Sequence, residues 1–243
     1  MRADVFVSAT LGISRNQASE LIKSKNITLN ENMIDKPSLE VKGDERVVAN
    51  DNIYVSRAAL KLKGFLGELK PCFLNLNALD VGSSTGGFVQ ILLENGVKSV
   101  TALDVGSDQL STVLRNDKRV IVQENTDIRK FNSSKFDLVT VDVSFISILQ
   151  ILNDIDRLAK RDIILLFKPQ FEVGANAKRS KKGVVKDKKL INLSKAKFEI
   201  AASELGWSLK KSKESVIIGK EGNLELFYYY VKRQDRSDCD RPF

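Results

Sequence analysis

Two acids and a lysine stand at the ends of apolar runs in this chain. Asp142 closes one run, Lys168 directly follows another, and Glu225 opens a run in which polar and apolar residues alternate. Pro169 cannot extend a strand, so Lys168 is expected at the rim of a sheet. Because ligands bind outside the carboxyl ends of parallel strands, the three residues favour acid–base chemistry over one pocket. Taken singly, each is also compatible with an ordinary charged residue at a strand end.

The run Leu79 to Phe88 holds a glycine-rich turn between an apolar strand and the start of a helix. Such a turn brings backbone N–H groups close to a ligand. Asp104 stands 22 positions after Gly82, where a second strand is expected to end, and a carboxylate there binds ribose hydroxyls in doubly wound sheets.

The glycine pattern differs from the G-x-G-x-x-G of dinucleotide sites, and no basic residue stands in the turn to meet a phosphate. It favours a phosphate-poor nucleoside, with S-adenosylmethionine as the leading candidate, while an ordinary tight turn is the simpler alternative. The residues expected to hold this cofactor are Gly82, Ser84, Gly86 and Gly87 at its methionine end, Asp104 at its ribose and Asp127 at its adenine.

Histidine is absent from the 243 residues. Its absence excludes Ser-His-Asp and Cys-His catalysis and most zinc sites, so a general base must be Lys, Asp, Glu or Tyr, and we expect no metal. Cys72 and Cys239 are far apart, which is typical of free thiols in a reducing compartment. Since the sequence shows no transmembrane-length apolar run and no signal-peptide h-region, we expect a cytoplasmic protein without membrane insertion.

The elements that would position these residues alternate between strand and helix from residue 76 onward. This rhythm predicts an α/β fold with a Rossmann-like parallel sheet covered on both faces. The expected elements are strands at 78–81, 100–104, 120–123, 138–142 and 163–167, a helix at 190–205, and an antiparallel edge made of strands at 208–213 and 225–232.

Residues 1–50 have the pattern of a smaller α+β domain. The expected elements are a helix at 5–11, a helix capped by Ser14, and strands at 27–29 and 46–48 with a turn at 36–38 between them. Residues 51–56 are expected to form a linker, 57–234 the main domain and 235–243 a frayed tail. Ser56 is expected to cap a helix from which Lys61 projects away from the apolar face.

The net charge of +8 is unevenly distributed along the chain. Residues 1–57 hold eight basic and eight acidic residues, whereas residues 176–220 hold thirteen basic and four acidic ones. A basic surplus of this kind is typical of a surface that contacts phosphate groups. A solvated lysine-rich surface is the alternative.

Six stretches carry a family resemblance by their order and spacing: 14–18, 55–62, 79–88, 142–147, 168–174 and 222–227. Together they resemble the TlyA family of ribosomal RNA 2'-O-methyltransferases, long labelled hemolysin A. The resemblance implies a methyltransferase domain of the RrmJ/FtsJ type, S-adenosylmethionine as cofactor, and an N-terminal RNA-binding domain like that of ribosomal protein S-four. The chain resembles the shorter form of the family, which implies a cytidine in large-subunit rRNA. It departs from the family at Asn30-Glu31, where Asn-Gly is usual, and this leaves the turn uncertain.

The resemblance places the family's Lys-Asp-Lys-Glu tetrad on Lys61, Asp142, Lys168 and Glu225, with Lys63 as a competitor for the first position. A neutral amine could remove the proton of a ribose hydroxyl, and burial and a neighbouring cation favour the neutral form of a lysine. Lys168 is the expected base. Asp142 would orient Lys168 and the donor, Lys61 would stabilise the developing charge, and Glu225 would hold a lysine or the ribose.

The expected partner is ribosomal RNA or a ribosomal subunit, while the oligomeric state stays open. The residues expected to contact RNA are Arg15, Lys23 and Lys36 in the N-terminal domain and Lys178, Arg179, Lys181 and Lys182 in the basic segment. Three other classes of function stay open: an RNA-binding assembly factor without catalysis, a membrane-lytic protein, and a methyltransferase of small molecules.

Overall fold

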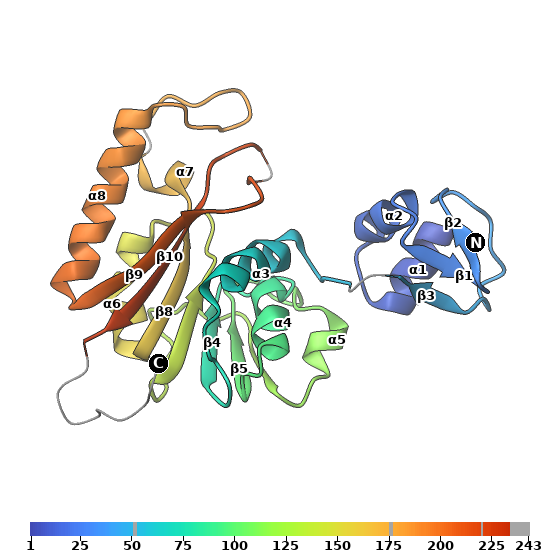
Figure 1. Ribbon diagram of the computed structural model, residues 1–243, viewed down its shortest axis with the longest axis horizontal. Coiled ribbons are helices and arrows are strands. Elements are labelled where there is room, and N and C mark those ends of the chain that lie inside the picture. Colours follow the sequence, from blue (N-terminus) through green and yellow to red (C-terminus); the bar gives the residue numbers. More distant parts are fainter. Residues whose placement is uncertain (51–52, 175–176, 220, 234–243) are drawn as a thin grey trace.

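The computed structural model describes residues 1–50, 53–174, 177–219 and 221–233. A small N-terminal domain lies to one side of a larger domain that is built on a seven-stranded sheet (Figure 1). The expected tail at 235–243 and the first two residues of the expected linker lie outside the described residues.

The N-terminal domain packs two helices on a three-stranded antiparallel sheet of order β2-β1-β3. As expected, Ser14 caps the second helix: its Oγ accepts the N–H of Gln17, whose side chain returns to the Ser14 backbone. The elements are α1 (Ala3–Leu11), α2 (Arg15–Lys23), β1 (Ile27–Leu29), β2 (Asn32–Ile34) and β3 (Val47–Ala49).

Strand β2 is absent from the elements expected from the sequence pattern, which has only a turn at 36–38 between the first and the last strand. The chain first reverses at Asn30 and Glu31, where the family resemblance implies a turn, and the φ angles there are 45° and 69°. Two successive positive φ angles make the turn that suits a two-residue hairpin. Because Glu31 occupies a position where glycine is unstrained, the sequence offers no clear hairpin signal here.

The larger domain has the strand order β6-β5-β4-β7-β8-β10-β9. Strands β4 to β8 are parallel to one another, and the last two strands are antiparallel to their neighbours. Its strands are β4 (Asn77–Val81), β5 (Ser99–Leu103), β6 (Val120–Gln123), β7 (Phe136–Val141), β8 (Ala159–Phe167), β9 (Trp207–Glu214) and β10 (Leu226–Lys232). The expected parallel sheet is confirmed, and so is the antiparallel edge made of β9 and β10, in which β10 pairs with β8 and β9 is the outermost strand.

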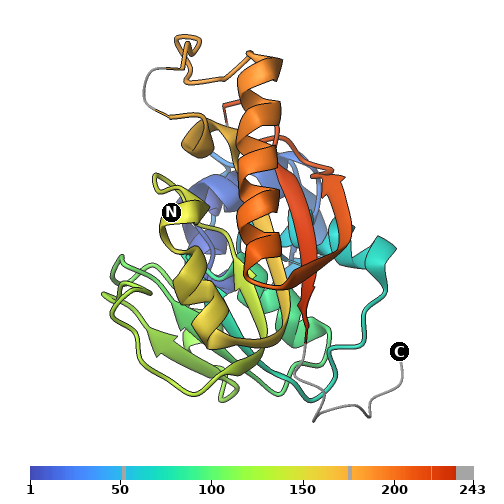
Figure 2. The ribbon, with the colours of Figure 1, turned by 90° about the vertical axis from the view of Figure 1, so that its left-hand side faces the viewer.

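Helices cover both faces of this sheet. On one face α6 and α8 pack over a core that contains Phe198 and Trp207, and α8 crosses in front of the C-terminal strands (Figure 2). On the other face α3, α4 and α5 cover a core that contains Phe65 and Phe227. The helices are α3 (Arg57–Leu69), α4 (Gly87–Glu94), α5 (Thr112–Arg115), the 3-10 helix η1 (Ile148–Gln150), α6 (Leu152–Leu158), α7 (Pro169–Glu172) and α8 (Lys188–Glu204).

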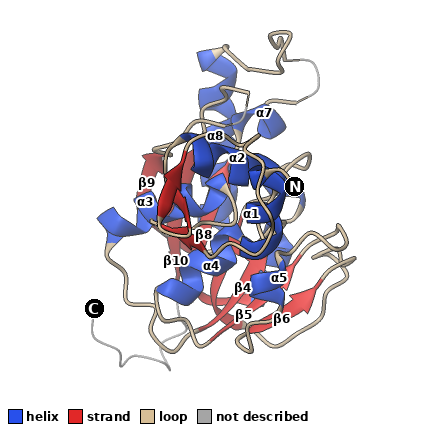
Figure 3. Cartoon of the chain, turned by 90° about the vertical axis from the view of Figure 1, so that its right-hand side faces the viewer, coloured by secondary structure: helices blue, strands red, loops and turns tan. Residues whose placement is uncertain are grey.

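The strand order reverses between β4 and β7. From β4 the chain first adds β5 and β6 toward one edge, as Figure 3 shows, and then crosses back to place β7 on the other side. Such a reversal leaves a crevice outside the carboxyl ends of the two central strands. The fold therefore sets the glycine turn after β4 beside the segment that follows β7.

The described part of the linker is tied to both domains. Gln17 of α2 donates to the carbonyl of Tyr54, while Gln90 of α4 donates to the carbonyl of Ile53 and accepts the N–H of Val55. These bonds hold the segment immediately before α3 against α4 of the larger domain.

Candidate active site

The glycine turn after β4 is shaped by close packing within the protein. A Cβ at Gly82 would lie 2.8 Å from the carbonyl oxygen of Asp142, and one at Gly87 would lie 2.2 Å from Ser56 Oγ. A Cβ at Gly86 would meet Leu114 at 2.3 Å. The glycines are thus required by the approach of the segment after β7, of α3 and of α5 to the turn, whereas the sequence suggested only the approach of a ligand.

A cavity of about 190 Å³ opens over this turn. The turn residues 82–85 form one wall, and the beginning of α3 lies beside them. Three ionisable side chains from the central strands and their ends also line it: Asp80, Asp142 and Lys168. The structure therefore brings the cofactor turn and two of the expected catalytic residues to one cavity.

Asp80 is a site residue that the sequence analysis missed. It is buried in β4, its Oδ1 accepts the Thr140 hydroxyl at 2.6 Å, and its Oδ2 has no hydrogen-bond partner among the described residues. Burial raises the pKa of Asp80 to about 7, the Thr140 hydrogen bond opposes this rise, and the carboxylates of Asp142 and Asp104 add to it. The signal available in the sequence was an acid inside an otherwise apolar strand.

Lys168 and Asp142 form an ion pair in the cavity wall. The Lys168 Nζ lies 2.7 Å from Asp142 Oδ1 and donates to Ser144 Oγ at 2.9 Å. Only 8% of Lys168 is exposed. Pro169 begins α7 directly after it, so the strand ends at the lysine as expected.

Lys61 and Glu225 form a second ion pair, in which Nζ and Oε2 are 2.6 Å apart. Both residues are buried, and neither lines the cavity. Lys61 was expected to project away from the apolar face of α3. In the structure it is nevertheless buried, because the segment before β10, which carries Glu225, covers it. Lys63, the competing candidate, is exposed and contacts the Tyr54 hydroxyl, which favours Lys61 as the tetrad residue.

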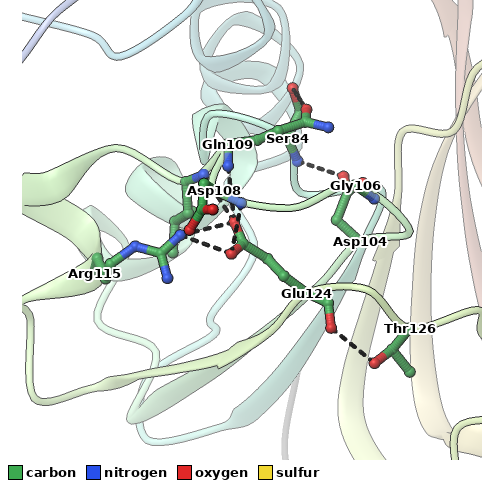
Figure 4. Close-up of polar contacts among 9 residues, drawn as sticks. Ser84, Asp104, Gly106, Asp108, Gln109, Arg115, Glu124 and Thr126 are labelled. Atoms are coloured by element: carbon green, nitrogen blue, oxygen red, sulfur yellow. Dashed lines mark hydrogen bonds and ion pairs between the residues drawn. The ribbon is translucent and has the colours of Figure 1, made fainter.

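Asp104 follows β5 and faces the glycine turn (Figure 4). Its Oδ2 accepts the N–H of Ser84 at 2.7 Å, and its Oδ1 accepts the N–H of Gly106 at the same distance. Asp127 instead pairs with Arg129, which lowers the pKa of Asp127 to about 2. Neither aspartate contributes to the cavity wall described above.

Next to Asp104 lies a carboxylate that the sequence analysis also missed. Glu124, directly after β6, accepts hydrogen bonds from three consecutive backbone N–H groups and from Arg115 (Figure 4). Its partners are mostly backbone groups, so the role of Glu124 could not be predicted from the spacing of side chains in the sequence.

The segment after β7 presents an exposed aromatic ring. Phe145 is 91% exposed, its φ angle is 65°, and its ring centroid lies 5.2 Å from that of Phe171. A positive φ is costly for a bulky residue. Ser144, the residue directly before it, contacts Lys168, so this ring is attached next to a residue that touches the expected base.

The residues expected to contact RNA lie on the surface, but two of them have partners within the protein. Arg15 pairs with the buried Asp4. Arg179 donates to the backbone carbonyls of Gln170 and Gly174, which ties the basic segment to α7. Among the residues expected to contact RNA, the lysines are all exposed: Lys23, Lys36, Lys178, Lys181 and Lys182.

Known proteins match both domains of this chain. Residues 1–47 match the S4 domain, and residues 54–233 match the FtsJ-like methyltransferase family. The chain is 52% identical to the 23S rRNA (cytidine-2'-O)-methyltransferase TlyA of Campylobacter jejuni, over 96% of this chain and 100% of that protein. This chain belongs to the TlyA family. The 16S/23S rRNA (cytidine-2'-O)-methyltransferase TlyA of Mycobacterium tuberculosis is 38% identical, over 96% of this chain and 90% of that protein.

A solved structure has the same fold. A protein from Streptococcus thermophilus that is described as a putative hemolysin superposes with a TM-score of 0.70 at 30% identity, over 96% of this chain and 88% of that chain. In the described part of the present chain, no helix is both long enough and apolar enough to cross a membrane.

Proposed function

We propose that this protein transfers the methyl group of S-adenosylmethionine to the ribose 2'-oxygen of a cytidine in ribosomal RNA of the large subunit. The observation that carries the proposal is the Lys168–Asp142 pair in the wall of the cavity over the glycine turn. The names of the Campylobacter and Mycobacterium relatives support the RNA, the nucleotide and the position of the methyl group.

The residues around the cavity fit this cofactor. Asp80 offers an unpartnered, buried carboxylate oxygen to the donor's α-ammonium group. The start of α4, where Gly87 and Phe88 line the cavity, offers helix N–H groups to its carboxylate. Asp104 would accept from the ribose hydroxyls, and Asp127 would meet the adenine. When bound, S-adenosylmethionine supplies a methyl group on a positively charged sulfur.

Lys168 is proposed as the general base. In its neutral form, Nζ takes the proton of the 2'-hydroxyl while the oxygen attacks in line, and the proton remains on Nζ as an ammonium. Asp142, 2.7 Å away, stabilises that ammonium, and Ser144 Oγ fixes the direction of the side chain. Holding the reacting groups in line supplies much of the acceleration, because the donor is already reactive.

Lys61 and Glu225 are proposed to act from behind the cavity wall. Glu225 neutralises the Lys61 ammonium, which makes its burial tolerable. The pair keeps a cation near the reacting oxygen, where it stabilises developing negative charge. Of the two partners expected for Glu225, a lysine or the ribose, it contacts the lysine Lys61.

Phe145 is proposed to stack on a base of the acceptor strand. Single-stranded RNA is commonly bound by aromatic side chains that stack on unpaired bases. A ring that is 91% exposed, supported by Phe171 and adjacent to Ser144, is suited to this role.

We also propose a cytoplasmic location for this protein, because rRNA is modified in the compartment where ribosomes are assembled.

The test is to map 2'-O-methyl groups in both ribosomal RNAs from cells with and without this protein, and from cells that carry Lys168→Ala. We expect one cytidine of the large-subunit rRNA to lose its methyl group in the deletion strain and in the variant strain. An unchanged methylation map in the deletion strain would contradict the proposal. A mark that persists with Lys168→Ala would contradict the role of this lysine alone.

A further inference from the structure

Glu124 is a partly buried carboxylate that the proposed transfer reaction does not use. Its side chain is 9% exposed. Oε2 accepts the N–H of Asp108 at 3.0 Å, and Oε1 accepts those of Gln109 and Leu110 at 3.0 and 3.1 Å. The Nη2 of Arg115 lies within 2.8 Å of both oxygens. A single carboxylate therefore gathers three consecutive backbone donors and a guanidinium.

The three N–H groups belong to the loop that leaves β5, here called the donor loop (residues 104–110). The donor loop begins with the expected ribose ligand Asp104 and continues with Val105, whose side chain is 72% exposed. Asn125 and Thr126, which follow Glu124, donate their N–H groups to the carbonyls of Gly106 and Asp104 at 2.9 Å. Glu124 thus stands at the centre of the contact between the loops that follow β5 and β6.

The donor loop is also joined to the glycine turn. Ser84 Oγ and Gln109 Oε1 are 3.2 Å apart, and the N–H of Ser111 donates to the carbonyl of Thr85. Leu110 is buried, and its Cδ1 lies 2.8 Å from where a Cβ of Gly86 would stand. A displacement at 108–110 would therefore move both Asp104 and the turn that faces it.

We infer that Glu124, oriented by Arg115, is a positioning residue that fixes the donor loop and thereby pre-forms the nucleoside half of the donor site. The inference rests on the proposed function, because it takes S-adenosylmethionine as the ligand. In this inference Glu124 acts through the N–H groups of the loop and would not touch the ligand itself. Its role is to hold Asp104 and Val105 in the arrangement that the ribose and adenine require.

The chemistry of the cluster requires a carboxylate at this position. The hydrogen bond from Arg115, and then those from the backbone N–H groups, lower the pKa of Glu124 to about 2 against the effect of burial. Glu124 is therefore ionised throughout the pH range in which the protein works. Glutamine would replace one acceptor oxygen by a donor NH₂ group and direct it at other donors, leaving N–H groups of residues 108–110 without their charged partner.

Two ligands separate the two halves of the donor site. Adenosine occupies only the nucleoside half, whereas S-adenosylmethionine occupies both. Glu124→Gln is expected to weaken binding of both ligands by the same factor, about tenfold or more, as for the loss of hydrogen bonds to a charged group. Asp80→Asn is expected to weaken binding of S-adenosylmethionine and leave that of adenosine unchanged.

The measurement is calorimetric titration of the full chain with each ligand, together with hydrogen exchange of the amides of residues 108–110. For Glu124→Gln we expect faster exchange at these amides. We also expect methyl transfer at saturating donor to stay within about threefold of wild type, since the substitution leaves the general base Lys168 in place.

A matched control is Asp117→Asn. Asp117 also pairs with an arginine, Arg119, and accepts a backbone N–H, but it lies before β6, away from the donor loop. This control should bind both ligands as the wild type does.

Arg115→Met keeps the three backbone bonds and removes only the guanidinium. It should lose less affinity than Glu124→Gln, again equally for the two ligands, and it serves as the test if Glu124→Gln does not fold. If the amides of Glu124→Gln exchange faster but both ligands bind with wild-type affinity, Glu124 stabilises only the fold of the loop and the inference is wrong. If the wild-type protein binds neither ligand, the proposed function fails instead.

Discussion

The two halves of the proposed site, one for the methyl donor and one for the RNA acceptor, are built in different ways. The donor half lies within one stretch of sequence, from Asp80 to Asp127, and two of its carboxylates, Asp104 and Glu124, are held mainly by backbone N–H groups. The acceptor half is held by two lysine–carboxylate pairs, and the members of one, Lys61 and Glu225, are 164 positions apart. The donor half is thus a local structure of three neighbouring strand ends, whereas the acceptor half exists only when distant segments have met.

This difference predicts that the two halves fail separately. Loss of a side chain in the acceptor half should stop chemistry or weaken the fold while the donor still binds. Changes in the donor half should alter affinity for the donor and leave the RNA contacts intact. The following substitutions test that separation, beginning with the largest effect.

Lys168→Ala should abolish methyl transfer and leave affinity for S-adenosylmethionine near the wild-type value. A general base contributes about 10²- to 10⁴-fold to rate, and Lys168 acts on the acceptor. Lys168→Arg should be equally inactive, because a guanidinium does not deprotonate at usable pH. Single-turnover methyl transfer measured beside donor titration checks both. Appreciable turnover of the arginine variant would remove Lys168 from the role of base.

Lys61→Met should lower the free energy of unfolding by about 3–5 kcal/mol, because it leaves the Glu225 carboxylate buried without its partner. The double variant Lys61→Met with Glu225→Leu removes both charges. It should recover most of that stability and remain inactive. Chemical denaturation and activity assays of the three proteins check this. A double variant as active as wild type would show that the pair serves only the fold.

Asp80 should make the stability of the ligand-free protein depend on pH. Its pKa is about 7 in the folded chain and 3.8 by its ordinary value. The unfolded chain therefore ionises first, and stability is lost as pH rises from about 4 to about 7. Asp80→Asn should not show this loss. Thermal denaturation across this range, compared between the two proteins, is the measurement, and parallel curves would contradict it.

Donor affinity should show the opposite dependence on pH, because the donor's ammonium group favours the ionised Asp80. Binding should strengthen between about pH 6 and about pH 7, by no more than about tenfold per pH unit for a single proton. The variant Asp80→Asn is the control and should bind with little dependence on pH in this interval. Calorimetric titration at several pH values measures both proteins, and equal pH profiles would contradict this role of Asp80.

Neutralising the exposed lysines of the basic segment should give the smallest effect, and only on RNA. Replacing Lys178, Lys181 and Lys182 by glutamine should reduce the slope of log affinity against log salt by up to about 0.7 to 0.9 per lost phosphate contact. Arg179 is left in place because it donates to backbone carbonyls. Removal of residues 1–50 should instead erase preference for the cognate RNA while keeping much of the slope. Affinity for cognate and scrambled RNA at several salt concentrations checks this, and an unchanged slope in the lysine variant would identify a solvated surface.

The donor half could be located from the sequence because its signal is local. An apolar strand, a glycine turn and an acid after the next apolar strand are all visible in residues 79–104. The supporting residues were not visible. Asp80 looks like any acid in a strand until its burial is known, and Glu124 is held by backbone groups that almost every residue carries.

The acceptor half depended on family resemblance for Lys61 and on strand ends for Asp142 and Lys168. Spacing could not show that Lys61 is buried, since the cover comes from the segment that carries Glu225. For the same reason, spacing could not show the position of β10 in the sheet, where it pairs with both β8 and β9. The alternation of its residues marks a strand, but its neighbours are set by packing far along the chain.

The interior position of β10 has a consequence for the order in which the molecule is made. Synthesis begins at the N-terminus, and domains generally fold as they emerge, so the small first domain can form early. The larger sheet lacks an inner strand until residues 226–232 have left the ribosome. Until then Lys61 cannot form its ion pair with Glu225. A nascent chain can thus hold its RNA-binding domain folded while its catalytic centre is still incomplete.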